Sequence, residues 1–331
     1  MKKYTLFCVI IFTLISCAGN DSFVLQGSIG KDNRVLVVTS GSNWVGDVGI
    51  ELKNFMGEPM LGLPQPEPQI TLSQVAPNGF SKMMKVSRNI LVIEESDAEK
   101  FTVNNNKYAQ PQTIVYISAK DKKGLLAQLK KHETEILNIF RSSDIKVVQR
   151  RFASKKLDDS KYKTFQNLNI SLTIPEEFKT VDDTGDFLWL RHHLKSGIAR
   201  GAGSSNLLVY TLPLTYENKI IEQIASIRDS IGKVHIPGAK EDMHMITEKA
   251  YTPSTINTTI KGLKSFETRG KWEVKNDFMA GPFLNYTIVD KANHRLLVIE
   301  GFTYAPSVNK RDFIFELEAI AKSLKIKETS S

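Results

Sequence analysis

Residues 269–283 contain the closest grouping of side chains that could bind a ligand. Arg269, Trp272 and Asp277 bring a guanidinium, an indole and a carboxylate into nine residues, and glycine and proline interrupt the segment. Clefts that bind sugars or anionic polymers use such mixtures of aromatic and polar groups. A buried tryptophan beside a structural salt bridge is the alternative explanation. With an upstream tryptophan and arginine, the predicted binding surface consists of Trp189, Arg191, Arg269, Trp272 and Asp277.

Two carboxylates of this segment, Glu273 and Asp277, raise the alternative of a cell-wall or glycan hydrolase. Its general acid would need an apolar pocket that raises its pKa, so that one carboxyl group is protonated while the other is ionised. The sequence contains no G-x-S-x-G and no H-E-x-x-H motif. We therefore favour a non-enzymatic protein, with no catalytic residue and no cofactor.

A periplasmic copper site is a further alternative. Met243, His244 and Met245, with His235 eight residues before Met243, supply thioether and imidazole groups, which suit soft copper. In a strand the two methionines would share one face, which favours packing in a core instead. No metal site is predicted on these residues alone.

The first seventeen residues indicate where the protein works. Lys2 and Lys3 precede an apolar run that is too short to span a membrane, and residues 14–17 read Leu-Ile-Ser-Cys. This order is similar to a lipobox, in which the cysteine is lipidated. We predict a signal peptide over residues 1–16, a palmitate-bearing anchor on Cys17 and a tether over 17–33. An ordinary cleaved leader is the alternative.

The residues after Cys17 lack the acidic run of surface-exported lipoproteins, so we expect an outer-membrane lipoprotein that faces the periplasm. Cys8 and Cys17 are the two cysteines, and Cys8 would leave with the leader. A mature chain without a free thiol excludes thiol catalysis and cysteine-ligated zinc. The chain has 44 basic and 36 acidic residues. This excess favours the membrane, an anionic envelope polymer or an envelope protein as partner, and export makes nucleic acid improbable.

Residues 34–152 predict an α/β domain, because buried-strand patterns alternate with helical ones. We expect strands at 34–39, 69–75, 89–94, 113–118 and 145–152, and a helix at 121–141. Polar residues 153–164 predict a linker.

Residues 165–331 predict an α+β sandwich with an antiparallel sheet. We expect strands at 168–174, 187–193, 207–212, 284–289 and 295–302. A helix is expected at 216–232, and Ser307 is expected to cap the last helix.

Several short motifs resemble an uncharacterised family of Bacteroidetes-type lipoproteins that is catalogued as a domain of unknown function. They lie at residues 63–68, 108–112, 189–191, 235–238, 269–272, 301–306 and 310–312. The order of strands and helices in the second half is also similar to the PsbP/Mog1-like sandwich, whose members are mostly binding or assembly modules. The resemblance supplies no activity that could be carried over to this chain. We therefore predict a membrane-tethered, non-enzymatic binding or assembly module.

Overall fold

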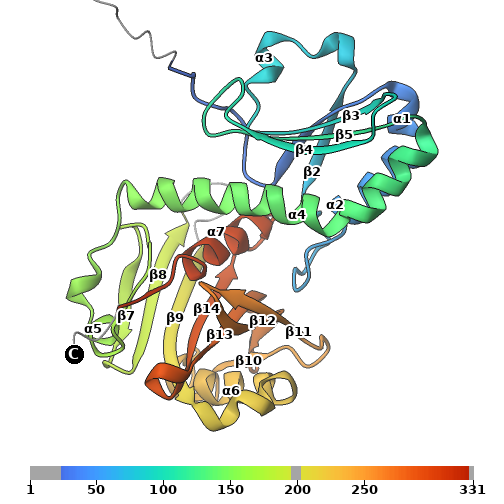
Figure 1. Ribbon diagram of the computed structural model, residues 1–331. Helices are drawn as coiled ribbons and strands as arrows, with labels where there is room; N and C mark the ends of the chain where they lie inside the picture. The colour runs from blue at the N-terminus through green and yellow to red at the C-terminus, as the bar shows by residue number, and fades with distance from the viewer. Residues whose placement is uncertain (1–23, 195–202, 328–331) are drawn as a thin grey trace, which may run out of the picture.

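A single long helix, α4 (Lys122–Ala153), separates two β-sheets in the computed structural model, which describes residues 24–194 and 203–327 (Figure 1). The helix has 32 residues, so it is about 48 Å long at about 1.5 Å per residue. Asp121 caps its N-terminus by accepting a hydrogen bond from the Gly124 N–H. No helix in the described part of the chain is both long and apolar enough to cross a membrane.

The first sheet has the strand order β2-β1-β3-β5-β4. Its strands are β1 (Arg34–Val38), β2 (Thr71–Val75), β3 (Asn89–Glu95), β4 (Lys100–Asn105) and β5 (Thr113–Ala119), and its helices are α1 (Gly41–Val45), α2 (Asp47–Met56) and α3 (Lys82–Lys85). All pairings are parallel except that of β4, which lies antiparallel at the edge. Apolar residues of α2 and α4 cover one face of this sheet. The predicted mixed α/β layer is confirmed.

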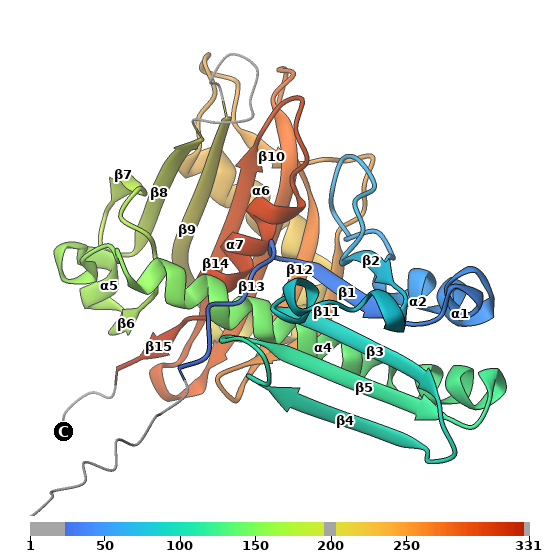
Figure 2. The same cartoon turned by 90° about the horizontal axis from the view of Figure 1, so that it is seen from above.

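The second sheet is antiparallel, with the order β10-β12-β13-β14-β9-β8-β7 and β11 paired to β12 (Figures 1 and 2). Its strands are β7 (Lys179–Asp183), β8 (Phe187–Leu194), β9 (Gly203–Pro213), β10 (Met245–Thr247), β11 (Ser254–Ile260), β12 (Leu263–Val274), β13 (Ala280–Asp290) and β14 (Arg295–Tyr304). Helices α6 (Ile220–His235) and α7 (Arg311–Ala321) accompany it. Strands β6 (Ile170–Ser171), which follows the short helix α5 (Lys163–Asn167), and β15 (Lys325–Ile326) pair in a separate two-stranded antiparallel sheet. The predicted α+β sandwich is confirmed.

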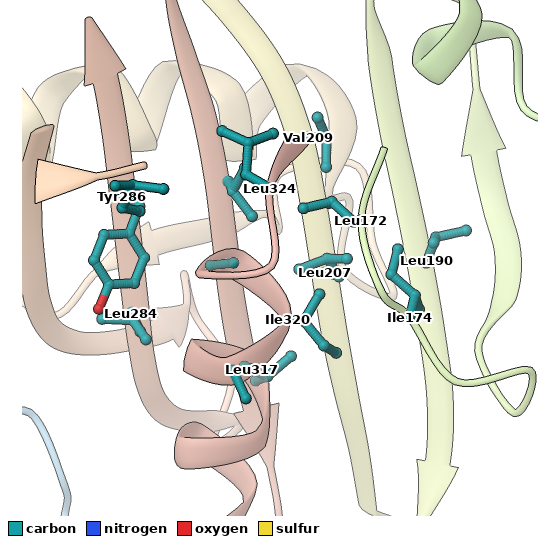
Figure 3. Packing of buried hydrophobic residues seen from close by; sticks show 14 of the residues in the cluster. Leu172, Ile174, Leu190, Leu207, Val209, Leu284, Tyr286, Leu317, Ile320 and Leu324 are labelled. Carbon is teal, nitrogen blue, oxygen red and sulfur yellow. The ribbon is translucent and has the colours of Figure 1, made fainter. Parts of the chain in front are cut away.

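Side-chain alternation gives the second sheet two faces with different cores. Leu284 and Tyr286 of β13 point toward α7 and pack with Leu317 and Ile320 (Figure 3). Phe283, which precedes Leu284 in the strand, belongs to the opposite face, where the end of α6 packs. Both faces are therefore covered, which explains why β13 and β14 are buried at nearly every position.

Three sequence expectations were wrong. Residues 145–152 continue α4 instead of forming a strand, because Ile145, Val148 and Phe152 have helical spacing and pack into the α7-side core. Of residues 168–174, the strand β6 includes Ile170 and Ser171 alone. The first residue of α7 is Arg311, so Ser307 does not cap it.

A carboxylate from the first half takes the place of the missing cap. Glu67 is buried, and it accepts hydrogen bonds from the backbone N–H groups of Lys310 (2.6 Å) and Arg311 (3.2 Å). A negative charge is stabilised at a helix N-terminus, where the backbone N–H groups lack partners. The first half of the chain therefore helps to fix α7 against the second sheet.

Candidate functional site

A cavity of about 450 Å³ lies on the α6 side of the second sheet, beside the residues that follow α6. Strands β8, β9, β12 and β14 supply its walls, and the turn between β12 and β13 supplies part of its rim. Four of the five predicted surface residues line it, namely Trp189, Arg191, Trp272 and Asp277. The sheet pairing brings these residues together although they are far apart in the sequence.

Asn206 fixes the tryptophan and the arginine of β8. Its Oδ1 atom accepts hydrogen bonds from Trp189 Nε1 and from Arg191 Nε, each at 3.0 Å. The Arg191 guanidinium lies 4.7 Å from the centre of the Trp189 ring, a cation–π distance. Because Asn206 is the register partner of Arg191 on β9, the three groups are held by the regular geometry of the sheet.

No described side chain neutralises the charge of Arg191. Its side chain is half-buried, and burial lowers the pKa of the guanidinium. Among the described residues no carboxylate forms an ion pair with Arg191. The Nε atom is occupied by Asn206, while the two terminal nitrogens are available to a ligand. A guanidinium in this state can bind a carboxylate or phosphate through two parallel hydrogen bonds.

Aromatic rings form the rest of the wall. Trp272 is buried and makes edge contacts with Phe302 and Tyr304, at centroid distances of 5.3 and 6.5 Å. Its Nε1 atom has no acceptor in the described part of the protein. Gly281 allows this packing, because a Cβ there would lie 2.0 Å from the Thr303 carbonyl oxygen.

Asp277 lies at the rim and is the one carboxylate among the described lining residues. It is exposed, and its Oδ1 atom accepts a hydrogen bond from the Phe278 N–H at 2.6 Å. Phe278 itself is fully exposed beside the cavity. The cavity thus has an aromatic wall, one unpaired cation and a polar rim.

Arg269 was placed wrongly in the predicted surface. It lies on β12 three residues before Trp272, so it faces the α7 side of the sheet. Its Nη2 atom donates to Glu318 at 2.7 Å, and its Nε atom donates to Glu267 at 2.6 Å. Glu318 also accepts hydrogen bonds from Arg141 of α4 and from Lys322. Arg269 therefore belongs to a buried ion network, as the alternative explanation of a structural salt bridge proposed.

The carboxylate pair of the hydrolase alternative is not assembled. Glu273 lies between Trp272 and Val274, which both line the cavity, so alternation along β12 turns Glu273 to the other face. Among the residues that the structure describes, Asp277 therefore has no second carboxylate across the cavity. Glycosidases require two carboxyl groups that face each other across the scissile bond.

The residues of the copper alternative are distributed over different surroundings. Met245 is buried and Met243 packs against the same core cluster, while the His235 ring stacks on Phe187 at 3.8 Å. Within residues 24–194 and 203–327, no three His, Cys, Asp or Glu side chains form a group that could hold a metal ion. Met245 instead lines the cavity as an apolar wall residue. Cys17 lies outside the described residues.

Sequence reasoning missed Asn206, Phe302 and Tyr304. Asn206 had no visible signal, because its function depends on its register opposite Arg191. The two aromatic residues lay in a motif that was used for the family resemblance alone. Motifs at 189–191, 235–238, 269–272 and 301–306 each contribute a residue to the cavity.

Comparisons with known proteins give a family but no activity. A family model described as a domain of unknown function (DUF4837) matches residues 157–323, which is just over half of the chain. A second one, also described as a domain of unknown function (DUF8532), matches residues 28–153. No curated protein matches the chain.

Solved structures with a similar chain trace are distant. The Ran-binding protein Mog1p of Saccharomyces cerevisiae is 10% identical, with a TM-score of 0.33, over 49% of this chain and 92% of its own. LpqN, involved in cell envelope biogenesis of Mycobacterium tuberculosis, is 11% identical, with a TM-score of 0.28, over 48% and 83% of the two chains. At these scores the likeness extends to the α+β fold and to nothing further.

Proposed function

The chain belongs to a family whose function is unknown, DUF4837, and from its cavity we propose that it is a membrane-tethered, non-enzymatic binding module of the cell envelope. The ligand is an anionic group of an envelope polymer, a carboxylate or phosphate on a sugar-like body. This group binds Arg191, and the body of the ligand lies against the aromatic wall.

The state of Arg191 is the observation that supports this proposal most directly. A half-buried cation is costly unless it is paired, because burial removes part of its hydration. Asn206 and the Trp189 ring hold the guanidinium in one place but supply no negative charge. An anionic ligand would supply that charge in a site that is already organised, so little ordering of side chains would oppose binding.

The walls define the rest of the ligand. Trp189, Trp272 and Tyr304 line the cavity, the two tryptophans with a small exposed fraction each, and aromatic side chains with a polar atom suit the mixed faces of sugar rings. A volume of about 450 Å³ lies within the range of small-molecule sites, so one or two sugar units fit better than a folded partner. The absence of a facing carboxylate among the described residues supports binding without hydrolysis.

Tryptophan fluorescence can test the binding proposal, because two of the three tryptophans line the cavity. We expect N-acetylmuramic acid, which bears a carboxylate, or glucose 1-phosphate to change the emission of the protein, while glucose has little effect. Arg191→Gln should weaken binding at least about tenfold, since a charge-assisted hydrogen bond contributes about 1.5–3 kcal/mol. Arg34→Gln is the matched control, because it removes one arginine charge at an exposed position on β1, in the first sheet.

Equal weakening by both variants would contradict the proposal, since it would show a nonspecific effect of net charge. Binding of glucose as strongly as the two anionic sugars would contradict it as well.

The membrane tether is proposed from the leader and Cys17. Two acyl chains would hold the protein stably on a bilayer, at about 0.8 kcal/mol for each buried CH₂. We expect radiolabelled palmitate to be incorporated into the wild-type chain and the label to be lost in Cys17→Ser. A Cys17→Ser protein that is still labelled and fractionates with the outer membrane would contradict the anchor.

A further inference from the structure

Near one end of the first sheet, three segments without acidic residues come together. They are residues 24–31, 68–93 and 100–120, and none of them contains aspartate or glutamate. Backbone hydrogen bonds join them, from Ile29 N–H to the Val86 carbonyl and from Ser28 N–H to the Gln110 carbonyl. Asp32 and Asp144 lie at the same end, but both are largely buried and paired with Arg88, so the exposed charged side chains of the three segments are lysines.

Lysines and aromatic rings alternate on this surface. The Lys85 ammonium lies 5.7 Å from the Phe80 ring and 5.5 Å from the Tyr108 ring. Lys107 lies 5.2 Å from Tyr108, and its Nζ donates a hydrogen bond to the Tyr116 hydroxyl at 3.1 Å. These contacts hold the aliphatic stems of the lysines along the rings while the charges stay at the surface.

Methionines and aliphatic residues extend the same surface. Met83 of α3 is 77% exposed, between exposed Lys82 and exposed Met84. Val24 and Ile29 are also exposed, and both lie in the segment that is hydrogen-bonded beside α3. We call this surface the α3 patch, which consists of Val24, Ile29, Phe80, Lys82, Met83, Met84, Lys85, Lys107 and Tyr108.

The proposed lipid anchor would emerge next to the α3 patch. Seven residues separate Cys17 from Val24, and a fully extended chain of that length reaches at most about 25 Å. A lipidated Cys17 would therefore keep Val24, and with it α3, within about 25 Å of the bilayer. The rest of the molecule extends the other way, since α3 lies on the side of the first sheet opposite α4 and the second sheet (Figure 1).

We propose that the α3 patch binds the anionic phospholipid headgroups of the membrane that carries the anchor. This inference rests on the proposed lipid tether. The lysines pair with lipid phosphates, the exposed methionine and aliphatic side chains enter the headgroup region, and the ring of Tyr108 lies at the interface that tyrosine prefers. Bound in this way, the protein directs its second sheet and the cavity away from the lipid.

The strength of the contact can be derived from the lysines. Each lysine near an anionic bilayer strengthens binding about fivefold at physiological ionic strength. Removal of three such charges should therefore weaken binding about a hundredfold, and high salt should weaken it similarly.

Vesicle co-sedimentation tests the patch without the anchor. The protein is the chain from residue 17 onward with Cys17→Ser, and the vesicles contain phosphatidylcholine with or without 30% phosphatidylglycerol. We expect the protein to bind the vesicles with phosphatidylglycerol and not those without it. The affinity of the triple variant K82Q/K85Q/K107Q for these vesicles should be about a hundredfold lower. The triple variant K240Q/K249Q/K291Q removes the same charge from exposed lysines of the second half and should bind as the parent does.

A fluorescent label gives a second readout that does not depend on the charge variants. The Cys17→Ser chain has no cysteine, so Met83→Cys can be labelled uniquely with an environment-sensitive dye. We expect its emission to shift to the blue with anionic vesicles, while a label at Lys249→Cys stays unchanged.

The proposal is overturned if the parent protein does not bind anionic vesicles, or if the two triple variants lose affinity equally. It is also overturned if the emission of the dye at Met83→Cys does not shift. These outcomes are independent of lipidation, because every protein in the assay lacks the anchor. Failure of palmitate incorporation in the wild type would instead contradict the tether and leave the vesicle result unaffected.

Discussion

Arg191 and Arg269 lie on opposite faces of one sheet and have opposite electrostatic surroundings. Arg191 is half-buried, with one hydrogen bond to an amide and no ion pair within the described chain. Arg269 is buried, with two carboxylates at 2.6 and 2.7 Å. The comparison teaches that an arginine beside tryptophan in sequence serves structure or binding according to whether the fold supplies its counter-charge.

The network around Arg269 also joins the two halves of the chain. Glu318 of α7 receives hydrogen bonds from Arg141 on α4, from Arg269 on β12 and from Lys322. A buried charge that loses one partner leaves the others uncompensated. The paired arginine should therefore matter for stability, and the unpaired arginine for binding.

The largest effect is expected from Arg269→Met. Removing one partner of a buried ion pair costs about 3–5 kcal/mol, so the free energy of unfolding in urea should fall by about 3 kcal/mol. Arg191→Met is the matched control and should change stability by less than about 1.5 kcal/mol, since it removes one hydrogen bond to a neutral acceptor and no ion pair. Similar losses in the two variants would remove the distinction between the two faces.

The next effect concerns pH. Burial raises the pKa of Glu318, but Arg141, Lys322 and Arg269 outweigh it and hold the pKa well below its usual range. A carboxyl group whose folded pKa is depressed stabilises fully above its unfolded pKa of about 4.3, and that stability is lost as the pH falls through the folded pKa.

Wild-type stability should therefore decline more steeply below about pH 4.3 than that of Glu318→Gln, which cannot titrate at this position. Urea unfolding at a series of pH values measures the difference. Parallel curves for the two proteins would show that Glu318 has an ordinary pKa.

A smaller effect is expected from Asn206→Ala. The substitution leaves Trp189 Nε1 and Arg191 Nε without their acceptor, which should cost about 1–2 kcal/mol of stability. Tryptophan emission should also shift to the red as the ring loses its fixed position. Ser204→Ala removes only the acceptor of the Asn206 Nδ2 bond and should cost less than about 1 kcal/mol.

The smallest effect is expected from Phe278→Ser at the rim of the cavity. Phe278 is fully exposed, so its loss should leave the free energy of unfolding within about 0.5 kcal/mol of the wild type. A loss above about 1 kcal/mol, measured by urea unfolding, would show that the rim is packed and that the cavity is less open than described.

Local patterns in the sequence predicted the central strands well. β8 and β14 contain uninterrupted apolar runs, at 187–190 and 296–299, and both faces of the sheet are indeed covered. The mixed first sheet followed from the same reasoning. At residues 145–152 the apolar pattern fitted either a strand or a helix. These residues form the end of α4, because their helical spacing packs Ile145, Val148 and Phe152 into the α7-side core.

The site was predictable only in part because a strand has two faces. Trp272 and Arg269 were grouped by nearness in sequence, and a spacing of three residues places them on opposite sides. Gly270 was treated as an interruption of the segment, but it lies within β12. The reason is close packing, since a Cβ at Gly270 would lie 2.6 Å from a ring carbon of Phe283.

Helix α4 has a consequence for how the protein unfolds. Its last turns place Ile145, Val148 and Phe152 in the α7-side core, while its earlier residues Leu125 and Leu129 belong to the core of the first sheet. Unfolding of one core would therefore destabilise the helix against which the other core packs. The segments matched by the two family models should therefore unfold together and not independently. We expect calorimetry to record a single cooperative transition.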